Sequence, residues 1–366
     1  MLNGLGPHSL VVALAFIIGG VFGAVAQRTR FCAMGAIADI VLIGDWRRMR
    51  MWLLAIGVAI IGSALLHASG QIDLGKSIYR TPNFTWLSYL IGGLCFGFGM
   101  VLASGCGART LVRLGAGSLK SLVVLLVLGV VAYMTLRGIL GVLRVSLLEK
   151  IALYLPAGQD LPSLLGQFGV PPLPALAGCA LLLGGGALLF AGRYGERLSL
   201  VELAGGSLIG LLVVVGWYVS GHLGYLAEDP ETLQEAFVAT NSGRMESLSF
   251  VAPIAYTLDW LLLWSDSSRQ LTFAIASSIG VVVGSGCQAR LSGDFRWEGF
   301  GNLEDTANHL IGAALMGFGG VLAMGCTIGQ GISGLSTLAA GSLLTFLAIV
   351  AGARLAFAYQ LHRALA

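Results

Sequence analysis

The stretch LIGGLCFGFGMVLASGC at residues 90–106 recurs as LIGAALMGFGGVLAMGC at residues 310–326, with 11 identical positions out of 17. Shared hydrophobicity alone does not produce so many identities, so the two stretches form an internal repeat. Downstream, Gly117-Ser118-Leu119 matches Gly341-Ser342-Leu343 after a four-residue slip. Each unit therefore predicts a spanning helix, a Gly-Cys turn, a short polar segment and a second spanning helix.

The composition of the whole chain is that of a membrane protein. Of its 366 residues, 56% are hydrophobic and only 11% are charged, whereas soluble domains carry roughly 25% charged residues. This excludes a water-soluble globular protein. Apolar runs of about 20 residues, the length that spans a bilayer as a helix, lie near residues 9–26, 51–69, 88–104, 118–136, 173–191, 199–219, 270–286, 307–324 and 339–358. Because lipid offers no partner to backbone polar groups, we expect an all-α polytopic bundle.

The placement of charge is that of a multi-pass inner-membrane protein. Arginines gather at the ends of apolar runs, at positions 47, 48, 50, 193, 197 and 363. The net charge is only +3, so the positive-inside rule explains these residues better than a nucleic-acid partner does. No Lys or Arg precedes the first apolar run, which argues against a signal peptide.

The direction of the repeats depends on residues 247–264, an apolar segment interrupted by proline and aspartate. If it crosses the membrane, the repeats are parallel; if it does not, they are inverted, and Arg363 falls on the same side as Arg47 and Arg48. The positive-inside rule favours the inverted pair. We therefore expect about nine transmembrane helices plus short re-entrant helices in one domain, residues 1–366. Its predicted parts are repeat one at about 10–136, connecting helices at about 137–265 and repeat two at about 266–360.

The segments after Cys106 and Cys326 are too short to span, so each predicts a re-entrant helix with the cysteine near its N-terminus. Free backbone N–H groups and the positive end of the helix dipole would there face an anion. Glycine lets the backbone approach a ligand closely, because it has no β-carbon. The candidate glycines are Gly105, Gly107, Gly325 and Gly329.

Cysteine is the residue that suggests the chemistry of the site. A thiol is a weak, polarizable donor that suits a soft sulfur or selenium atom, and a helix N-terminus can also make it reactive. Repetition inside glycine turns favours function for Cys106 and Cys326. Cys32 follows two arginines that interrupt an apolar stretch, which favours function there too, with Arg30 as a further candidate.

The remaining cysteines give weaker signals. Cys95 and Cys179 lie within apolar runs and fit the packing role that buried cysteine often has. Cys287 lies in a weaker match, in which Ile18–Gln27 aligns with Ile279–Gln288, but the aligned residue in the first half is alanine. Either role therefore fits Cys287.

Sequence motifs for a cofactor or a metal are not supported. Gly329–Gly334 fits the G-x-G-x-x-G pattern, but no strand precedes it, as a dinucleotide site would require. The chain has no Cys-x-x-Cys, and its five histidines are scattered. We therefore expect neither a cofactor nor a metal.

At Arg30-Phe31-Cys32, Ala103–Cys106 and Ala323–Gly329, the chain resembles the YeeE/YedE family of bacterial thiosulfate-uptake membrane proteins. The resemblance covers roughly residues 10–136 and 270–358. It implies two inverted halves whose short helices point inward around a constricted path. It also implies that thiosulfate passes by successive S–H to sulfur hydrogen bonds with thiols that match Cys32, Cys106 and Cys326. Cys287 is additional to that set.

The leading hypothesis is transport of thiosulfate rather than catalysis. Members of the wider family are thought to handle other sulfur or selenium compounds, so sulfite and selenite stay open as substrates. A membrane thiol-disulfide redox protein and a purely structural subunit are the alternatives from other classes. The lack of Cys-x-x-Cys argues against the first, and polar turns at membrane depth argue against the second. Besides the lipid bilayer, the resemblance suggests a cytoplasmic sulfur-carrier protein as a partner.

Overall fold

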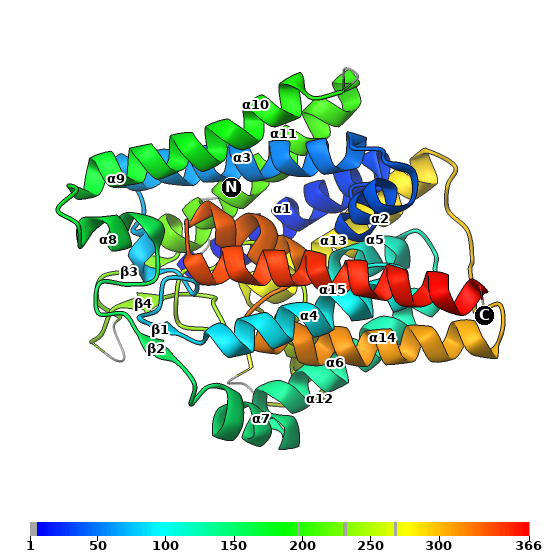
Figure 1. The fold of residues 1–366 in the computed structure, drawn as a ribbon. Coiled ribbons are helices and arrows are strands. Elements are labelled where there is room, and N and C mark those ends of the chain that lie inside the picture. The colour runs from blue at the N-terminus through cyan, green and yellow to red at the C-terminus, as the bar shows by residue number, and fades with distance from the viewer. Residues whose placement is uncertain (1–5, 196–197, 230–232, 267–268, 366) are drawn as a thin grey trace.

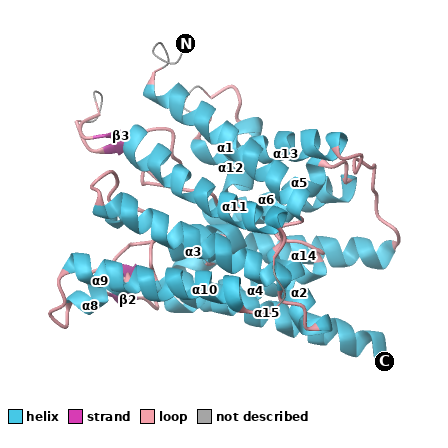
Figure 2. Ribbon diagram, turned by 90° about the horizontal axis from the view of Figure 1, so that it is seen from above, coloured by secondary structure: helices cyan, strands magenta, loops and turns pink. Residues whose placement is uncertain are grey.

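The computed structural model describes residues 6–195, 198–229, 233–266 and 269–365, which fold mainly as helices joined by loops (Figures 1 and 2). The helices are α1 (Pro7–Thr29), α2 (Ala33–Ile43), α3 (Arg47–Ala68), α4 (Trp86–Leu102), α5 (Gly107–Gly115), α6 (Leu119–Arg137), α7 (Ile139–Leu143), α8 (Leu161–Gly166), α9 (Pro172–Cys179), α10 (Gly186–Arg193), α11 (Leu200–Tyr218), α12 (Ala252–Leu262), α13 (Phe273–Leu291), α14 (Leu303–Leu322) and α15 (Ala340–Leu365). Two antiparallel pairs of short strands join β1 (Asn83–Phe84) to β2 (Leu153–Tyr154) and β3 (Tyr225–Leu226) to β4 (Ala236–Phe237).

The predicted all-α polytopic membrane class is confirmed. In the described part of the chain, 8 helical stretches are long and apolar enough to cross a membrane, and they match every predicted run except 307–324. That run lies in α14, a helix of 20 residues whose first turn carries two acidic residues. The interrupted segment at 247–264 forms only α12, of 11 residues. At 1.5 Å per residue α12 is about 16 Å long, which is shorter than the roughly 30 Å apolar core of a bilayer.

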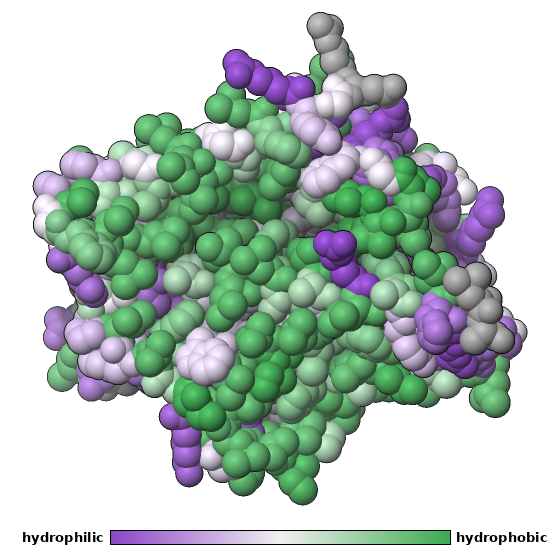
Figure 3. Space-filling model, in the orientation of Figure 1, coloured by the Kyte–Doolittle hydropathy of each residue, from purple (hydrophilic) through white to green (hydrophobic). Residues whose placement is uncertain are grey.

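The long helices run between two ends of the molecule (Figure 1). The hairpin end carries β1 to β4 and α8, and the C-terminal end carries the connection from α2 to α3 and the end of α15. Hydrophobic side chains cover most of the face in Figure 3, with hydrophilic ones mainly at its margins. An apolar surface of this extent is what a lipid-facing wall requires.

The two copies of the strong repeat, α4 and α14, pack directly against each other and run antiparallel. A β-carbon on Gly99 would lie 2.7 Å from the Gly312 carbonyl oxygen, and one on Gly312 would lie 2.6 Å from the Gly99 oxygen. Gly92 and Gly319 have the same reciprocal relation, at 2.7 and 2.6 Å. Antiparallel contact between equivalent helices is the arrangement that an inverted pair requires.

The weaker match, between α1 and α13, has a different geometry. Gly19 and Gly23 of α1 pack on Ser277 and Val281 of α13. Because the contacting residue numbers rise together along both helices, α1 and α13 run parallel. The glycines of α13 likewise pack on the α1 backbone. The spacing is that of small residues four apart, which lets membrane helices cross closely. These glycines therefore serve helix packing, and their parallel direction differs from the antiparallel relation of α4 and α14.

Candidate substrate path

Three cysteines follow the same backbone turn. Arg30, Ser104 and Met324, each two residues before a cysteine, have φ of 54°, 55° and 55°. The next N–H bonds back five residues in each case, from Phe31 to Ala26 at 3.1 Å, from Gly105 to Met100 at 2.8 Å and from Gly325 to Gly320 at 2.8 Å. This pattern is the Schellman motif, which ends a helix with a left-handed residue. The preceding helix therefore stops just before each thiol.

Each of these cysteines also starts the next helical segment. The carbonyl oxygens of Cys32, Cys106 and Cys326 accept from the N–H four residues on, at 3.0, 2.9 and 2.8 Å. The Sγ atoms of Cys32 and Cys326 accept from the N–H three residues on, both at 3.4 Å. A side chain at this position faces the positive end of the helix dipole. The re-entrant helices predicted after Cys106 and Cys326 are α5 and the helical segment 327–336.

The structure brings the three thiols together in the interior. Cys32, Cys106 and Cys326 are 7%, 2% and 0% exposed, and Cys106 lies near both of the others. A cavity of about 10 Å³, lined by Cys32, Cys106 and Arg109 among others, separates two of them. Such a volume holds about one water molecule. The path is thus almost closed, and the contact of these thiols with a substrate stays a prediction.

The loop at residues 247–250 packs between the two re-entrant helices. A β-carbon on Gly107 would lie 3.0 Å from the Phe250 carbonyl oxygen, and one on Gly329 would lie 2.6 Å from Ser249 Oγ. A β-carbon at Gly107 would press on the loop backbone, and one at Gly329 would require the Ser249 side chain to move, so glycine fits the close approach of the loop at both positions. The other two candidate glycines, Gly105 and Gly325, lie within the turns themselves.

A larger cavity opens on the hairpin side of Cys326. It measures about 190 Å³ and is lined by Ser249, Glu246 and the Gly325 turn, together with Ile78 and the end of α6 at Leu136. We call it the vestibule. The Glu246 carboxylate accepts from the Ser242 N–H at 3.0 Å, and its burial raises its pKa. The vestibule and the thiols follow in the order vestibule, Cys326, Cys106, Cys32.

Two predicted candidates lie outside this line. Arg30 is exposed, and in the structure it forms the left-handed turn before Cys32. Cys287 is exposed on α13, whereas the three thiols of the path are buried. Sequence reasoning missed Trp52 and Tyr79, which reach the thiols from α3 and from the loop before α4. No local motif marks either residue.

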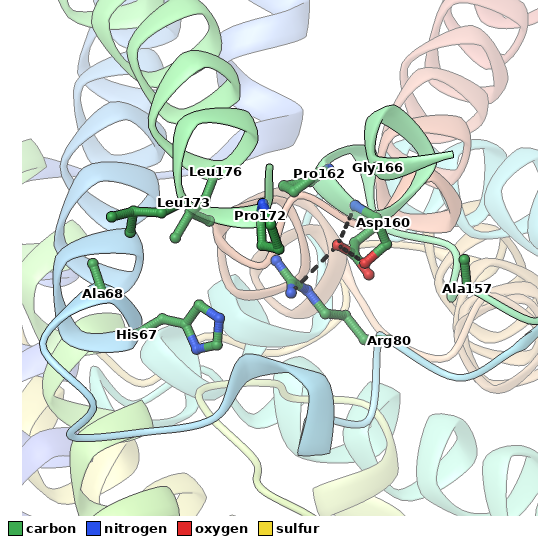
Figure 4. A pocket seen from close by; sticks show the side chains of 11 residues that line it. His67, Ala68, Arg80, Ala157, Asp160, Pro162, Gly166, Pro172, Leu173 and Leu176 are labelled. Atoms are coloured by element: carbon green, nitrogen blue, oxygen red, sulfur yellow. Dashed lines mark hydrogen bonds and ion pairs between the residues drawn. The ribbon is translucent and has the colours of Figure 1, made fainter. Parts of the chain in front are cut away.

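Both re-entrant helices are held at their far ends by a loop from elsewhere in the chain. At the hairpin end, the Leu161 N–H donates to the Leu338 carbonyl at 3.0 Å, and Arg80 Nε donates to Thr337 at 2.8 Å. Arg80 also pairs with Asp160 at 3.4 Å, and both side chains are buried beside a pocket of about 460 Å³ (Figure 4). We call these contacts the hairpin-end latch.

The second latch holds α5. The Leu119 N–H donates to the Glu298 carbonyl at 2.8 Å, and the Arg296 N–H donates to the Ala116 carbonyl at 3.1 Å. An ion pair between Lys120 and Glu298 at 2.6 Å completes it. The two latches fix the ends of the re-entrant helices, while the cysteines lie at their beginnings.

Comparison with known proteins finds relatives that match most of the chain. Residues 28–355 match the sulphur transport family. The chain is 27% identical over 345 residues to the thiosulfate transporter TsuA of Escherichia coli (strain K12), covering 88% of this chain and 87% of that protein. It is 28% identical over 348 residues to the thiosulfate transporter TsuA of Spirochaeta thermophila, covering 92% and 95%. A shorter match, 30% over 108 residues and 29% of this chain, is to the probable transporter YedE of Salmonella typhimurium, of which it covers 25%.

The match covers nearly the whole chain, both re-entrant helices and all three turns. Together with the apolar helices, it makes the chain a multi-pass protein of the bacterial inner membrane. The chain belongs to the sulphur transport family, the YeeE/YedE family of membrane proteins.

Proposed function

We propose that this protein takes up thiosulfate along the line from the vestibule through Cys326 and Cys106 to Cys32. The observation that carries the proposal is the set of three buried thiols, each at the start of a helix after the same Schellman turn. The relatives that match most of the chain are named thiosulfate transporters, which supports this choice of anion.

The chemistry of thiosulfate fits thiols in this position. Its terminal sulfur is soft and accepts hydrogen bonds from S–H donors, while helix N-termini stabilise its negative charge. Neighbouring thiols can pass the sulfur end along with no covalent bond made or broken, so the protein acts as a transporter and not as an enzyme. Because the path is narrow, the anion moves in steps between adjacent thiols.

The orientation of the path in the membrane follows from the charge at the C-terminal end. The end of α15 and the start of α3 lie together at the C-terminal end, where Arg363, Arg47 and Arg48 are found. The positive-inside rule makes this the cytoplasmic end and the vestibule the outer mouth. Released thiosulfate then reaches the cytoplasm beside Cys32, where a soluble sulfur-carrier protein is a reasonable acceptor.

Uptake of radiolabelled thiosulfate into proteoliposomes tests the proposal. We expect Cys326→Ala and Cys106→Ala to reduce uptake by about tenfold or more, since a hydrogen bond to a charged group contributes about 1.5–3 kcal/mol. Cys287→Ala and Cys179→Ala are matched controls that should transport normally. Undiminished uptake in both path variants would refute the relay.

Two further measurements separate the alternatives. The first is competition of sulfite and selenite against the uptake of radiolabelled thiosulfate. If either anion inhibits uptake more strongly than unlabelled thiosulfate does, that anion is the preferred substrate. Mass spectrometry of cysteines during transport should find free thiols throughout. Reversible oxidation of Cys106 or Cys326 would instead support a thiol-disulfide redox protein.

A further inference from the structure

Beside the thiols, the path carries buried hydrogen-bond donors that make no well-aligned hydrogen bond in the described part of the chain. They are Trp52 Nε1, Tyr79 Oη, Arg109 Nη1 and Thr327 Oγ1. Buried polar groups are almost always hydrogen bonded, because an unpaired donor loses its interaction with water and gains nothing in return. Trp52 Nε1 and Arg109 Nη1 therefore call for an acceptor that the described chain does not supply. The Tyr79 and Thr327 hydroxyls lie beside the Ser249 hydroxyl and the Cys106 thiol, and both can turn to an acceptor in the path.

The donors alternate with the thiols along the path. Tyr79 Oη lies near Ser249 at Gly329, next to Cys326, where a β-carbon on the glycine would be 3.2 Å from the phenol oxygen. Thr327 lies between Cys326 and Cys106 and faces the Cys106 thiol. The entry to Cys326 and the step from Cys326 to Cys106 thus each offer one soft S–H group and one O–H donor.

The inner step carries the nitrogen donors. Trp52 and Arg109 both line the small cavity with Cys32 and Cys106. The Trp52 ring stacks on Phe31, with centroids 4.8 Å apart and planes 14° apart, which fixes its direction. The Arg109 guanidinium lies near Cys32 and Cys106, so a positive charge lies at this step.

We propose that these donors bind the oxyanion end of the substrate while the thiols hold its sulfur end, so that the path selects anions that carry both. The inference rests on the proposed function and adds the specificity. A sulfate-like anion has no soft end for the thiols, and a sulfide-like anion has no oxygen for the donors. Thiosulfate has three oxygen acceptors and one terminal sulfur, and it fills both sets at once.

Isosteric substitutions at two donors test the inference. Tyr79→Phe and Thr327→Val remove a hydroxyl while preserving shape, and each should raise the half-saturating thiosulfate concentration about tenfold in proteoliposomes. Thr327→Ser keeps the hydroxyl but loses the methyl group, so it should transport like the wild type. This contrast separates a hydrogen-bond donor from a packing residue.

Matched controls come from hydroxyls away from the thiols. Tyr133→Phe removes a phenol oxygen that donates to Asp259, and Thr345→Val removes a buried hydroxyl on α15 that lacks a partner among the described residues. Neither should change the half-saturating concentration.

Three outcomes would overturn the inference. Unchanged half-saturation in both Tyr79→Phe and Thr327→Val would refute the donor role, as would equal shifts in the two controls. A Thr327→Ser defect as large as that of Thr327→Val would make the residue a packing element. A wild-type protein that takes up no thiosulfate would refute the proposed function itself. The first three outcomes, in contrast, refute only the donor role, since the wild type still transports.

Discussion

Ser104 and Met324, 220 positions apart, share a left-handed backbone with φ of 55°, and each lies two residues before a buried cysteine. The flanking hydrogen bonds repeat too, from Gly105 to Met100 and from Gly325 to Gly320, both at 2.8 Å. The left-handed conformation is unfavourable for residues with a β-carbon. Both halves therefore retain the same strained turn immediately before a thiol.

The strain at Ser104 can be measured by substitution. Ser104→Gly should raise the free energy of unfolding by about 0.5–1 kcal/mol, because glycine adopts positive φ without steric cost. Ser104→Val should lower it by about 1–2 kcal/mol, since a β-branched residue is disfavoured there. Thermal unfolding in detergent checks both. A lower melting temperature for Ser104→Gly would mean that the serine side chain stabilises the turn.

The close approach of α4 and α14 predicts a sharp contrast between two glycine substitutions. Gly312→Ala places a β-carbon 2.6 Å from the Gly99 carbonyl oxygen. The helices must then separate, which should cost about 1–3 kcal/mol. Gly178→Ala, in α9 with open space around it, should instead stabilise by about 0.5–1 kcal/mol. Equal effects of the two changes on thermal unfolding would contradict the packing argument.

The hairpin-end latch predicts a cost for removing one charge. Asp160→Asn keeps the shape of the cap on α8 but leaves the Arg80 guanidinium buried without its counter-ion. Breaking a buried pair in this way typically costs about 3–5 kcal/mol. Glu304→Gln, in the exposed pair with Arg363, is the control and should be nearly neutral. A melting temperature unchanged by Asp160→Asn would show that the latch does not stabilise the fold.

Glu246 predicts a pH dependence of stability. Burial raises the pKa of this vestibule carboxyl above its ordinary value of 4.5. The folded protein then holds the proton more tightly than the unfolded chain, so the stability from Glu246 is present below pH 4.5 and is lost as pH rises through the folded pKa. Glu246→Gln should therefore be more stable than the wild type at high pH, with the difference vanishing in acid.

Glu235, which is exposed, serves as a control because its pKa shifts in the opposite direction. Its hydrogen bond with Lys76 lowers its pKa, so its contribution is lost as pH falls. Melting temperatures of both glutamine variants between pH 4 and 9 check the prediction. A stability gain for Glu246→Gln that is the same at every pH would contradict the titration argument.

Much of the path could be predicted from the sequence because its signals are local. The repeat at 90–106 and 310–326 located two thiols and the end of each preceding helix, and the arginines before Cys32 pointed to the third. The structure confirms the helical class and brings these three cysteines together. Arg30, in contrast, was a site candidate, and the structure finds it exposed in the turn.

Other parts of the site could not be predicted, since they depend on long-range packing. Tyr79 and Trp52 lie far in sequence from Cys326 and Cys106, respectively. A hydropathy pattern therefore does not identify them as neighbours of these cysteines. The weaker match of α1 with α13 shows the same limit. Similar glycine spacing serves parallel packing there, whereas between α4 and α14 glycines serve antiparallel packing.

The sequence by itself determined the membrane setting, the helical class and the positions of the three thiols. These follow from local properties, namely apolar runs of spanning length and glycines beside cysteine. Only the tertiary structure decided which thiols meet, in what order they follow the vestibule, and which unpaired donors lie beside them. The physical reason is that helix direction and close approach depend on contacts between residues hundreds of positions apart, as between Gly99 and Gly312.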